Sequence, residues 1–420
     1  SNQSFTYDQA QNLTANGFSK TGYTFAGWAT SANGEVKYTN QQSVKNLTST
    51  NNTTVTLYAK WTANQYNLTL NPNSGSFKSD GTTTAKTLSP KLIYDGGNWN
   101  NINYYPVQRT GYIFNGWYTS TTGGTKVYNT DGTCVNGSGY WTNNLYKGTS
   151  NLTVYAQWKP ITYTVKYNEN GATSGSTASS SHTYDQAKNL TANGFTKTGY
   201  HFIGWSTSAN GNVVYSNQQS VKNLTTTNGG TVTLYAQWTA NKYTVVFNAN
   251  GGSGSMSNQS FTYDQAQNLT ANGFTKTGYT FAGWATSSNG KVVYTDKQSV
   301  KNLTSTKNAT VILYAQWTAN KYTVTYNANG GSGSMSSDTA TYDSNFITKK
   351  NTFTKTGYLF NGWNEKADGT GTAWSLSSAG VYESGKSWTW KYTSNITLYA
   401  QWKPITYTVK YNGNGATGGS

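Results

Sequence analysis

Five similar blocks in tandem constrain the fold of this chain of 420 residues more than any other feature. Each block contains Thr-Gly-Tyr followed by Phe-x-Gly-Trp, and each closes on Tyr-Ala-Gln-Trp or Tyr-Ala-Lys-Trp. The closing tryptophans lie 79 to 97 residues apart. A period of this length is typical of small modules that contact mainly their neighbours in the chain.

Cutting the chain after each closing tryptophan gives its predicted organisation. Residues 257–274 repeat residues 1–18 letter for letter, and residues 403–420 nearly repeat residues 159–176, so the array grew by copying blocks. The predicted units are residues 1–61, a repeat without its first strand; 62–158, a long repeat with an insertion; 159–238 and 239–317, two shorter repeats; 318–402, a second long repeat with an insertion; and 403–420, the first strand of a further repeat.

Within each repeat the hydrophobic pattern has mostly a period of two, which indicates strands. In residues 322–326, for example, two tyrosines and a valine alternate with threonines. Gly283, directly before Trp284, is a position where a missing Cβ allows a bulge or a close backbone approach. Residues 216–224 lack alternation, and their spacing of Val221 and Leu224 predicts one or two helical turns. The expected fold class is α+β, predominantly β.

Fifteen tryptophans supply much of the material for hydrophobic cores. We expect those in the two recurring motifs to be structural core residues, and we consider the other five, all in the long repeats, as possible ligand-binding residues. Exposed aromatic rings can pack on the apolar faces of sugars, although a larger repeat also needs a larger core. The predicted core residues are Trp28, Trp61, Trp117, Trp158, Trp205, Trp238, Trp284, Trp317, Trp363 and Trp402; the candidate ligand-binding residues are Trp99, Trp141, Trp374, Trp388 and Trp390.

The order of three motifs resembles a known family. Tyr-Thr-Val-x-Tyr/Phe-Asn-x-Asn-Gly-Gly, then Thr-Gly-Tyr-x-Phe-x-Gly-Trp, then Leu-Tyr-Ala-Gln-Trp is similar to the internalin-type B-repeat, or Listeria–Bacteroides repeat, over essentially the whole chain. The resemblance implies small β-grasp-like modules arranged in tandem on bacterial surface proteins. It implies no catalytic residues.

The inventory of reactive side chains argues against an enzyme. His182 and His201 are the only histidines, and both lie in one repeat, so no histidine mechanism can recur along the array. Cys134 is the only cysteine, which leaves no internal disulfide and no zinc-binding spacing. An aspartate does recur after tyrosine, and we interpret it as a turn residue that bonds nearby backbone; its positions are Asp8, Asp185, Asp264 and Asp343. We expect no catalytic residue, no metal and no cofactor.

The net charge of +16 raises the question of an anionic partner. All basic residues except Arg109 are lysines, spread along the chain, whereas bidentate reading of bases and phosphates favours arginine. We therefore expect no nucleic acid. Diffuse attraction to cell-wall or host glycans is compatible with the charge and should weaken with salt. No apolar stretch is long enough to predict membrane insertion.

The two chain ends suggest a further partner. The first repeat is predicted to lack its opening strand, and residues 403–420 form an opening strand without the rest of a repeat. That strand could complete the first repeat of another copy by strand addition, giving a head-to-tail assembly. Alternatively, residues 1–420 are a window of a longer periodic chain.

These observations favour a structural repeat region in an extracellular protein of the bacterial cell surface. Four-residue connections between repeats leave little slack, which predicts an elongated, semi-rigid rod acting as a stalk, filament or adhesin shaft. The alternative is a set of adhesin modules that bind carbohydrate or a host receptor through the aromatic residues of the long repeats.

Overall fold

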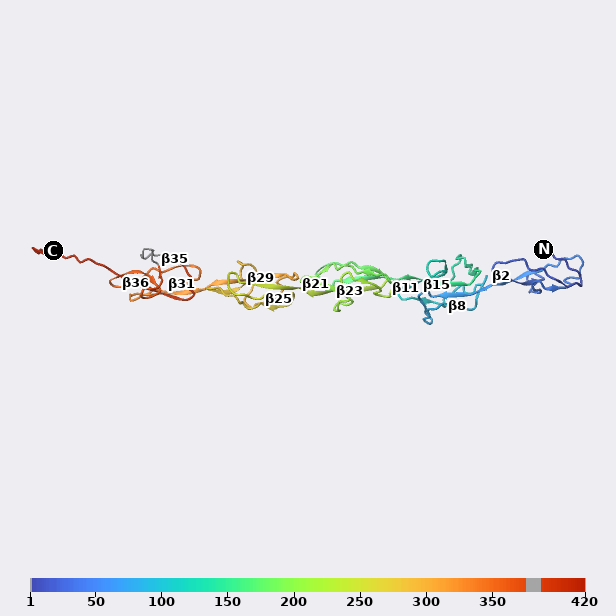
Figure 1. Cartoon of the computed structure of the whole chain (residues 1–420), viewed down its shortest axis with the longest axis horizontal. Helices are drawn as coiled ribbons and strands as arrows, with labels where there is room; N and C mark the ends of the chain where they lie inside the picture. Colours follow the sequence, from blue (N-terminus) through green and yellow to red (C-terminus); the bar gives the residue numbers. More distant parts are fainter. Residues whose placement is uncertain (1, 375–386, 420) are drawn as a thin grey trace. The chain divides into compact units, whose positions relative to one another are not determined.

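Each repeat of the computed structural model folds from its own contiguous stretch of sequence, as the unmixed colours in Figure 1 show. The structure describes residues 2–374 and 387–419. Contacts divide the chain into two compact units, Ser1–Phe195 with Ile203–Gln237, and Thr196–Phe202 with Trp238–Ser420.

The main sheet of the fourth repeat shows the common architecture. Its strand order is β25 (Gln259–Thr262), β24 (Lys242–Asn248), β29 (Thr310–Ala319) and β27 (Tyr279–Ala285). The central pair, β24 and β29, is parallel, and the outer strands run antiparallel to their neighbours. The alternation of β24 places Tyr243, Val245 and Phe247 in the core.

The other repeats use the same order with additions in the long ones. The third repeat has β18 (Ser180–Thr183), β16 (Thr162–Asn168), β23 (Thr231–Ala240) and β21 (Tyr200–Ser206). The second has β12 (Lys126–Tyr128), β11 (Tyr112–Tyr118), β15 (Leu152–Pro160), β6 (Leu68–Asn71) and β8 (Lys86–Thr87). The fifth has β31 (Asp338–Thr341), β30 (Lys321–Asn327), β36 (Ile396–Pro404), β33 (Tyr358–Asn364) and β34 (Ala373–Trp374). The first has β2 (Tyr23–Ala29) and β4 (Tyr58–Ala63).

Short antiparallel pairs complete the repeats. They are β1 (Gln11–Asn12) with β3 (Ser43–Val44), β5 (Gln65–Tyr66) with β9 (Leu92–Ile93), β7 (Ser76–Phe77) with β10 (Val107–Gln108), β13 (Trp141–Thr142) with β14 (Leu145–Tyr146), β19 (Lys188–Asn189) with β22 (Ser220–Val221), β26 (Gln267–Asn268) with β28 (Ser299–Val300), and β32 (Asn345–Ile347) with β35 (Ser387–Thr389). In addition, β17 (Ser174–Gly175) neighbours β20 (Phe195–Thr196).

The bulge expected at Gly283 is confirmed. The register of β27 against β29 shifts between Phe281 and Gly283, and Gly283 has φ = +142°. Because of the shift, Phe281 and Trp284 pack edge to face at 4.9 Å, although strict alternation would put them on opposite sides. A Cβ at Gly283 would lie 2.7 Å from the carbonyl oxygen of Tyr294, so the bulge requires glycine.

The predicted helical turns at residues 216–224 are wrong. Val221 lies in β22, which pairs with β19, and both Gln218 and Asn223 have left-handed backbone angles of 58°. Left-handed residues interrupt a right-handed helix, so the spacing of Val221 and Leu224 reflects turns instead. The described residues contain no helix at all, and the α part of the expected α+β class is therefore a misassignment. The β-grasp-like detail stays a prediction.

Residues 405–419, predicted to begin a further repeat, contain no strand in the structure. Their counterparts in the third repeat form β16, which lies between two partner strands. In the part of the chain that the structure describes, no strand pairs with residues 405–419, and the Ile405 N–H donates to the Gly357 carbonyl at 3.0 Å.

Candidate functional site

The contacts that link successive repeats form the most regular polar arrangement in the described chain. Where the fourth repeat meets the fifth, the Tyr279 hydroxyl donates a hydrogen bond of 2.8 Å to Oδ2 of Asp343. The backbone N–H of Asn320 donates to the carbonyl oxygen of Gly278 at 2.9 Å. The ring of Tyr342 packs edge to face against Tyr279, with centroids 5.6 Å apart. We call this arrangement the joint.

The same joint recurs between the other successive repeats. In each, a tyrosine from Thr-Gly-Tyr donates to an aspartate of the next repeat, and an adjacent tyrosine ring lies edge to face against it. The hydrogen bonds are Tyr23 to Asp95 at 2.7 Å, Tyr112 to Asp185 at 2.8 Å and Tyr200 to Asp264 at 3.0 Å, and the ring pairs are Tyr23–Tyr94, Tyr112–Tyr184 and Tyr200–Tyr263.

Glycine makes the close approach of the repeats possible. Gly278 has φ = +76°, in the left-handed region that glycine tolerates best. A Cβ at this position would lie 2.3 Å from Cγ of Tyr342. Glycine at this position therefore allows both the left-handed backbone conformation and the close packing of the Tyr342 ring.

A cation lies over the tyrosine ring of each Thr-Gly-Tyr motif. The charged group lies within 5 Å of the ring centroid in every repeat, at a distance where cation–π attraction is favourable. The pairs are Lys20–Tyr23 at 3.9 Å, Arg109–Tyr112 at 3.8 Å, Lys197–Tyr200 at 4.7 Å, Lys276–Tyr279 at 4.5 Å and Lys355–Tyr358 at 4.7 Å.

The recurring aspartate has a different role from the one we expected. Asp264 does lie in a turn, closed by the hydrogen bond from Gln265 N–H to the Thr262 carbonyl at 3.2 Å. Its carboxylate, however, accepts from Asn302 Nδ2 at 2.8 Å and from the Tyr200 hydroxyl. Lys301 Nζ also lies 3.5 Å from Oδ1 of Asp264. In the long repeats a lysine contacts the carboxylate at closer range: Lys147 bonds to Asp95, and Lys391 bonds to Asp343.

Sequence reasoning missed the joint and did not single out Asp95. A signal was present, since Thr-Gly-Tyr and Tyr-Asp each occur once in every repeat. Their separation of 64 to 73 residues prevents the local pattern from showing that they meet.

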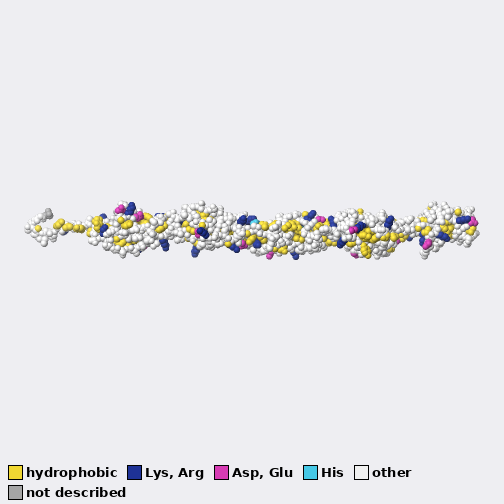
Figure 2. Space-filling view, turned by 90° about the horizontal axis from the view of Figure 1, so that it is seen from below, with side chains coloured by type: hydrophobic (Ala, Val, Ile, Leu, Met, Phe, Trp, Pro, Cys, Tyr) yellow, Lys and Arg dark blue, Asp and Glu magenta, His cyan; other side chains and the backbone are white. Residues whose placement is uncertain are grey.

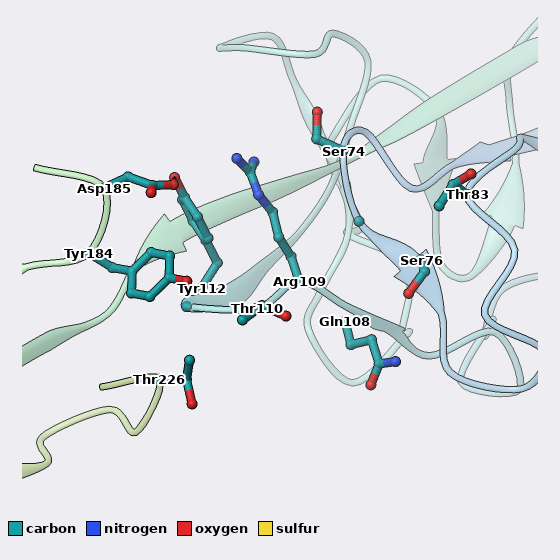
Figure 3. Close-up of a pocket in the computed structure, with 12 residues that line it drawn as sticks. Ser74, Ser76, Thr83, Gln108, Arg109, Thr110, Tyr112, Tyr184, Asp185 and Thr226 are labelled. Carbon is teal, nitrogen blue, oxygen red and sulfur yellow. Dashed lines mark hydrogen bonds between the residues drawn. The ribbon is translucent and has the colours of Figure 1, made fainter. Parts of the chain in front are cut away.

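The joint between the second and third repeats borders an open cleft of about 710 Å³. Figure 3 shows Arg109, Tyr112, Tyr184 and Asp185 side by side, with Ser74 on the far side of the Arg109 guanidinium. A second cleft, of about 400 Å³, lies within the second repeat beside Ile102. Neither cleft is lined by any of the five candidate ligand-binding tryptophans.

The structure buries most of those five candidates. Trp141, Trp374 and Trp390 lie in the cores of the long repeats, so their rings present no face to a sugar, and their assignment as possible ligand-binding residues is corrected on this ground. Trp99 and Trp388 are half-buried. The Trp99 indole donates to the Pro90 carbonyl at 2.5 Å, and its ring packs against Tyr105.

The ten motif tryptophans fall into two environments. Among those of Phe-x-Gly-Trp, Trp117, Trp205, Trp284 and Trp363 are buried, and Trp28 is half-buried. The closing tryptophans, which are Trp61, Trp158, Trp238, Trp317 and Trp402, are all half-buried.

Trp317 illustrates the second environment. Its indole N–H donates to the Ala249 carbonyl at 3.0 Å, and its ring lies over Gly252 of the Asn-Gly-Gly turn. The closing tryptophan thus packs on that turn and holds it against the edge of the core.

The other reactive side chains are spread apart. His182 is buried, stacks on Tyr163 and bonds through Nε2 to Ser180 Oγ at 2.9 Å. Burial raises the pKa of the Cys134 thiol, which keeps it protonated. Within residues 2–374 and 387–419, no three His, Cys, Asp or Glu side chains converge to hold a metal ion.

Cations are scattered over the face of the molecule seen in Figure 2, without a continuous basic patch. No helix in the described ranges is long and apolar enough to cross a membrane.

The repeated sheets and joints define the class of this chain as a tandem-repeat protein made of small mixed β-sheets. The sequence profile of the Listeria-Bacteroides repeat domain matches residues 1–60, 75–157, 163–237, 243–316 and 322–401. The chain therefore belongs to the Listeria-Bacteroides repeat family, as the motifs indicated.

Two similar proteins come from Evansella cellulosilytica and Listeria monocytogenes. A protein of Evansella cellulosilytica named as a Gly-rich membrane protein is 31% identical over 333 residues, covering 78% of this chain and 33% of the relative. Internalin H of Listeria monocytogenes is 33% identical over 223 residues, covering 49% of this chain and 35% of internalin H. The chain thus spans about a third of the length of each of these relatives.

The joints should respond to pH at both ends of the scale. The hydrogen bond from Asn302, together with the one from Tyr200, holds the pKa of Asp264 below its usual range. This contribution to stability is complete above about pH 4, the usual range of an unfolded aspartate, and is lost as the pH falls through the lower folded pKa. The hydrogen bond to Asp264 raises the pKa of Tyr200. The stability that the protonated Tyr200 contributes is complete below about pH 10, the usual range of an unfolded tyrosine, and is lost as the pH rises through the higher folded pKa.

We expect Asp264→Asn to reduce the loss of stability in acid relative to the unaltered chain, measured by amide exchange at the joint between pH 2 and 7. Asp296→Asn, which changes a carboxylate of the same repeat outside the joint, is the control. An equal acid response in both variants would contradict the assignment.

Proposed function

We propose that these repeats form the stalk of a bacterial surface protein, outside the cell, which holds a functional part of that protein away from the wall. The observation that carries this proposal is the joint, because the same tyrosine, aspartate, glycine and cation recur wherever one repeat follows another. A joint with fixed contacts limits the bending between neighbours, which a flexible linker would not.

The comparisons support a surface location through the names of the relatives, a membrane protein and an internalin. The chemistry of the chain supports a mechanical role rather than a catalytic one. Its recurring buried and half-buried tryptophans contribute to separate small cores, as in the second, fourth and fifth repeats, and we assign no reaction to the chain.

Pulling on single molecules tests the stalk directly. Each of the second to fifth repeats should unfold as a separate event, and each event should release about 260–350 Å at about 3.3–3.6 Å per residue. Smooth extension without steps, or a single step for the whole chain, would argue against a stalk of independent modules. Antibodies against the repeats should also label intact cells, and labelling only after lysis would rule out the surface location.

A further inference from the structure

A buried histidine of the third repeat occupies a position that is apolar in the two repeats that follow. His182 lies in β18, opposite Tyr163 of β16, and is 1% exposed. At the equivalent position the fourth repeat has Phe261, opposite Tyr243, and the fifth has Ala340. The ring of His182 stacks on that of Tyr163 with centroids 5.5 Å apart, which is also the distance between the two rings in the fourth repeat. The imidazole therefore fills a place in the core that an apolar side chain fills elsewhere.

The two ring nitrogens of His182 have different surroundings. Nε2 lies 2.9 Å from Oγ of Ser180, and that hydroxyl also lies 3.2 Å from the Tyr167 hydroxyl. Nδ1 is buried and has no hydrogen-bond partner among the residues that the structure describes. A neutral imidazole carries one N–H group, whereas a protonated imidazole carries two, and each buried N–H needs an acceptor. The site thus suits the neutral ring and leaves a charged ring with an unsatisfied donor.

The charged groups around His182 do not compensate a proton on its ring. Lys188 acts on the imidazole with a charge of the same sign, and its Nζ donates to a backbone carbonyl at 2.8 Å. The carboxylate of Asp185, three residues further along, accepts hydrogen bonds from Asn223 and Tyr112. Burial, together with Lys188, lowers the pKa of His182. The folded third repeat therefore resists a protonation that an unfolded histidine accepts.

Strand β18 connects this histidine to the joint between the second and third repeats. The strand is the outermost one of its sheet and pairs with β16. It ends at Thr183, and the next two residues, Tyr184 and Asp185, form the third-repeat side of the joint. Figure 3 shows both beside Tyr112 of the second repeat. A displacement of β18 therefore moves the two side chains that contact the preceding repeat.

We propose that protonation of His182 releases β18 from its sheet and opens the joint between the second and third repeats in mild acid. Release brings the imidazole into contact with water, which accepts from both N–H groups. It breaks the pairing of one short outer strand and leaves the parallel pair of β16 and β23 in place. The fourth repeat has Phe261 at the same position, so its own outer strand, β25, carries no such group.

The direction and range of the response follow from the two states of the ring. A histidine in an unfolded segment ionises near about pH 6.5. Above that pH the ring is neutral whether β18 is paired or released, and the joint stays closed. Below it the released form gains a proton first, so the ratio of released to paired chains rises by up to about tenfold per pH unit until the paired form is protonated as well. The joint aspartates respond only below about pH 4, which separates the two effects.

Amide exchange of the 420-residue chain at about pH 7.5 and about pH 5, resolved by residue, tests the proposal. The Ile161 N–H donates across the joint to the Gly111 carbonyl at 3.0 Å, and the Asn320 N–H donates likewise to Gly278 at the joint between the fourth and fifth repeats. Comparing these two amides at one pH removes the effect of pH on chemical exchange. Protection of Ile161 relative to Asn320 should fall about tenfold in acid, together with that of β18 relative to β25. Unchanged ratios would overturn the proposal.

Two substitutions assign the effect to one side chain. His182→Phe gives the third repeat the residue of the fourth, and both ratios should then stay constant between the two pH values. His201→Thr replaces the other histidine of this repeat by the residue at the equivalent position of the fourth, Thr280, and should leave the acid response intact. An acid response that survives His182→Phe, or one that His201→Thr abolishes, would contradict the assignment.

The outcomes also distinguish this inference from the stalk proposal, on which it rests. Loss of protection in β18 with Ile161 still protected would show that release of the strand does not reach the joint, and the stalk proposal would stand. Weak protection of both Ile161 and Asn320 already at about pH 7.5 would mean that the joints are not fixed. That result would contradict the stalk proposal itself, and with it the closed joint that acid is expected to open.

Discussion

Replacing Trp284 by alanine should unfold the fourth repeat while the others stay folded. Trp284 is fully buried and lies against Phe247, Phe274 and Phe281, at centroid distances of 4.8 to 6.2 Å. Truncating a buried tryptophan typically costs about 3–5 kcal/mol, which approaches the whole stability of a small module. Amide exchange followed by mass spectrometry should show loss of protection in β24, β27 and β29.

The first repeat provides a matched control for this prediction. Trp28 belongs to the same motif but is half-buried, so Trp28→Ala removes less buried surface and should cost less. The contrast would fail if the two substitutions cost the same, or if exchange in the fourth repeat stayed unchanged. Loss of protection throughout the chain would indicate that the repeats do not unfold separately.

Replacing Gly278 by alanine should open the joint between the fourth and fifth repeats. The added Cβ would meet the Tyr342 ring at 2.3 Å, and the backbone has φ = +76°. Left-handed strain costs an L-residue about 1–2 kcal/mol, and overpacking adds about 1–3 kcal/mol. We expect the thermal transition of this region to fall and residual dipolar couplings to show a less fixed orientation of these two neighbouring repeats.

Gly357→Ala separates strain from packing. Gly357 occupies the same motif with φ = +83°, but nothing lies within 4 Å of its Cβ position. This variant should therefore show the strain alone. Adding Tyr342→Ala to Gly278→Ala should recover the packing part of the loss, which a double-mutant cycle measures. Equal losses in the Gly278 and Gly357 variants would mean that the tyrosine ring does not hold the joint.

The repeats, the strands and the bulge could be predicted because each leaves a local signal. Alternation of Tyr243, Val245 and Phe247 is visible within seven residues, and Gly283 precedes a tryptophan in a strand pattern. The turn at Gln218 and Asn223 could not be predicted in this way. Its left-handed residues are not glycines, and the apolar spacing around it fits a short helix as well as a turn.

Sequence periodicity could not predict the joint, for a different reason. Tyr279 and Asp343 lie in different repeats, and each taken alone has an ordinary local explanation, one in a core strand and the other in a turn. The burial of the additional tryptophans was equally undetermined. A tryptophan in an insertion has the same local sequence signal whether it faces a ligand or an enlarged core, and the packing of Trp374 against Trp390 decides this only in three dimensions.

The distribution of the joint residues bears on how such a chain changes length over generations. A single repeat carries the glycine and tyrosine that meet its successor, and also the tyrosine and aspartate that meet its predecessor, as the fourth repeat does with Gly278, Tyr279, Tyr263 and Asp264. Recombination between equivalent positions of two repeats therefore deletes or inserts a whole repeat. The glycine and tyrosine of the preceding repeat then still meet the tyrosine and aspartate of the following one. Variation in copy number requires no new interface, and the gene can adjust the reach of its product without altering any contact.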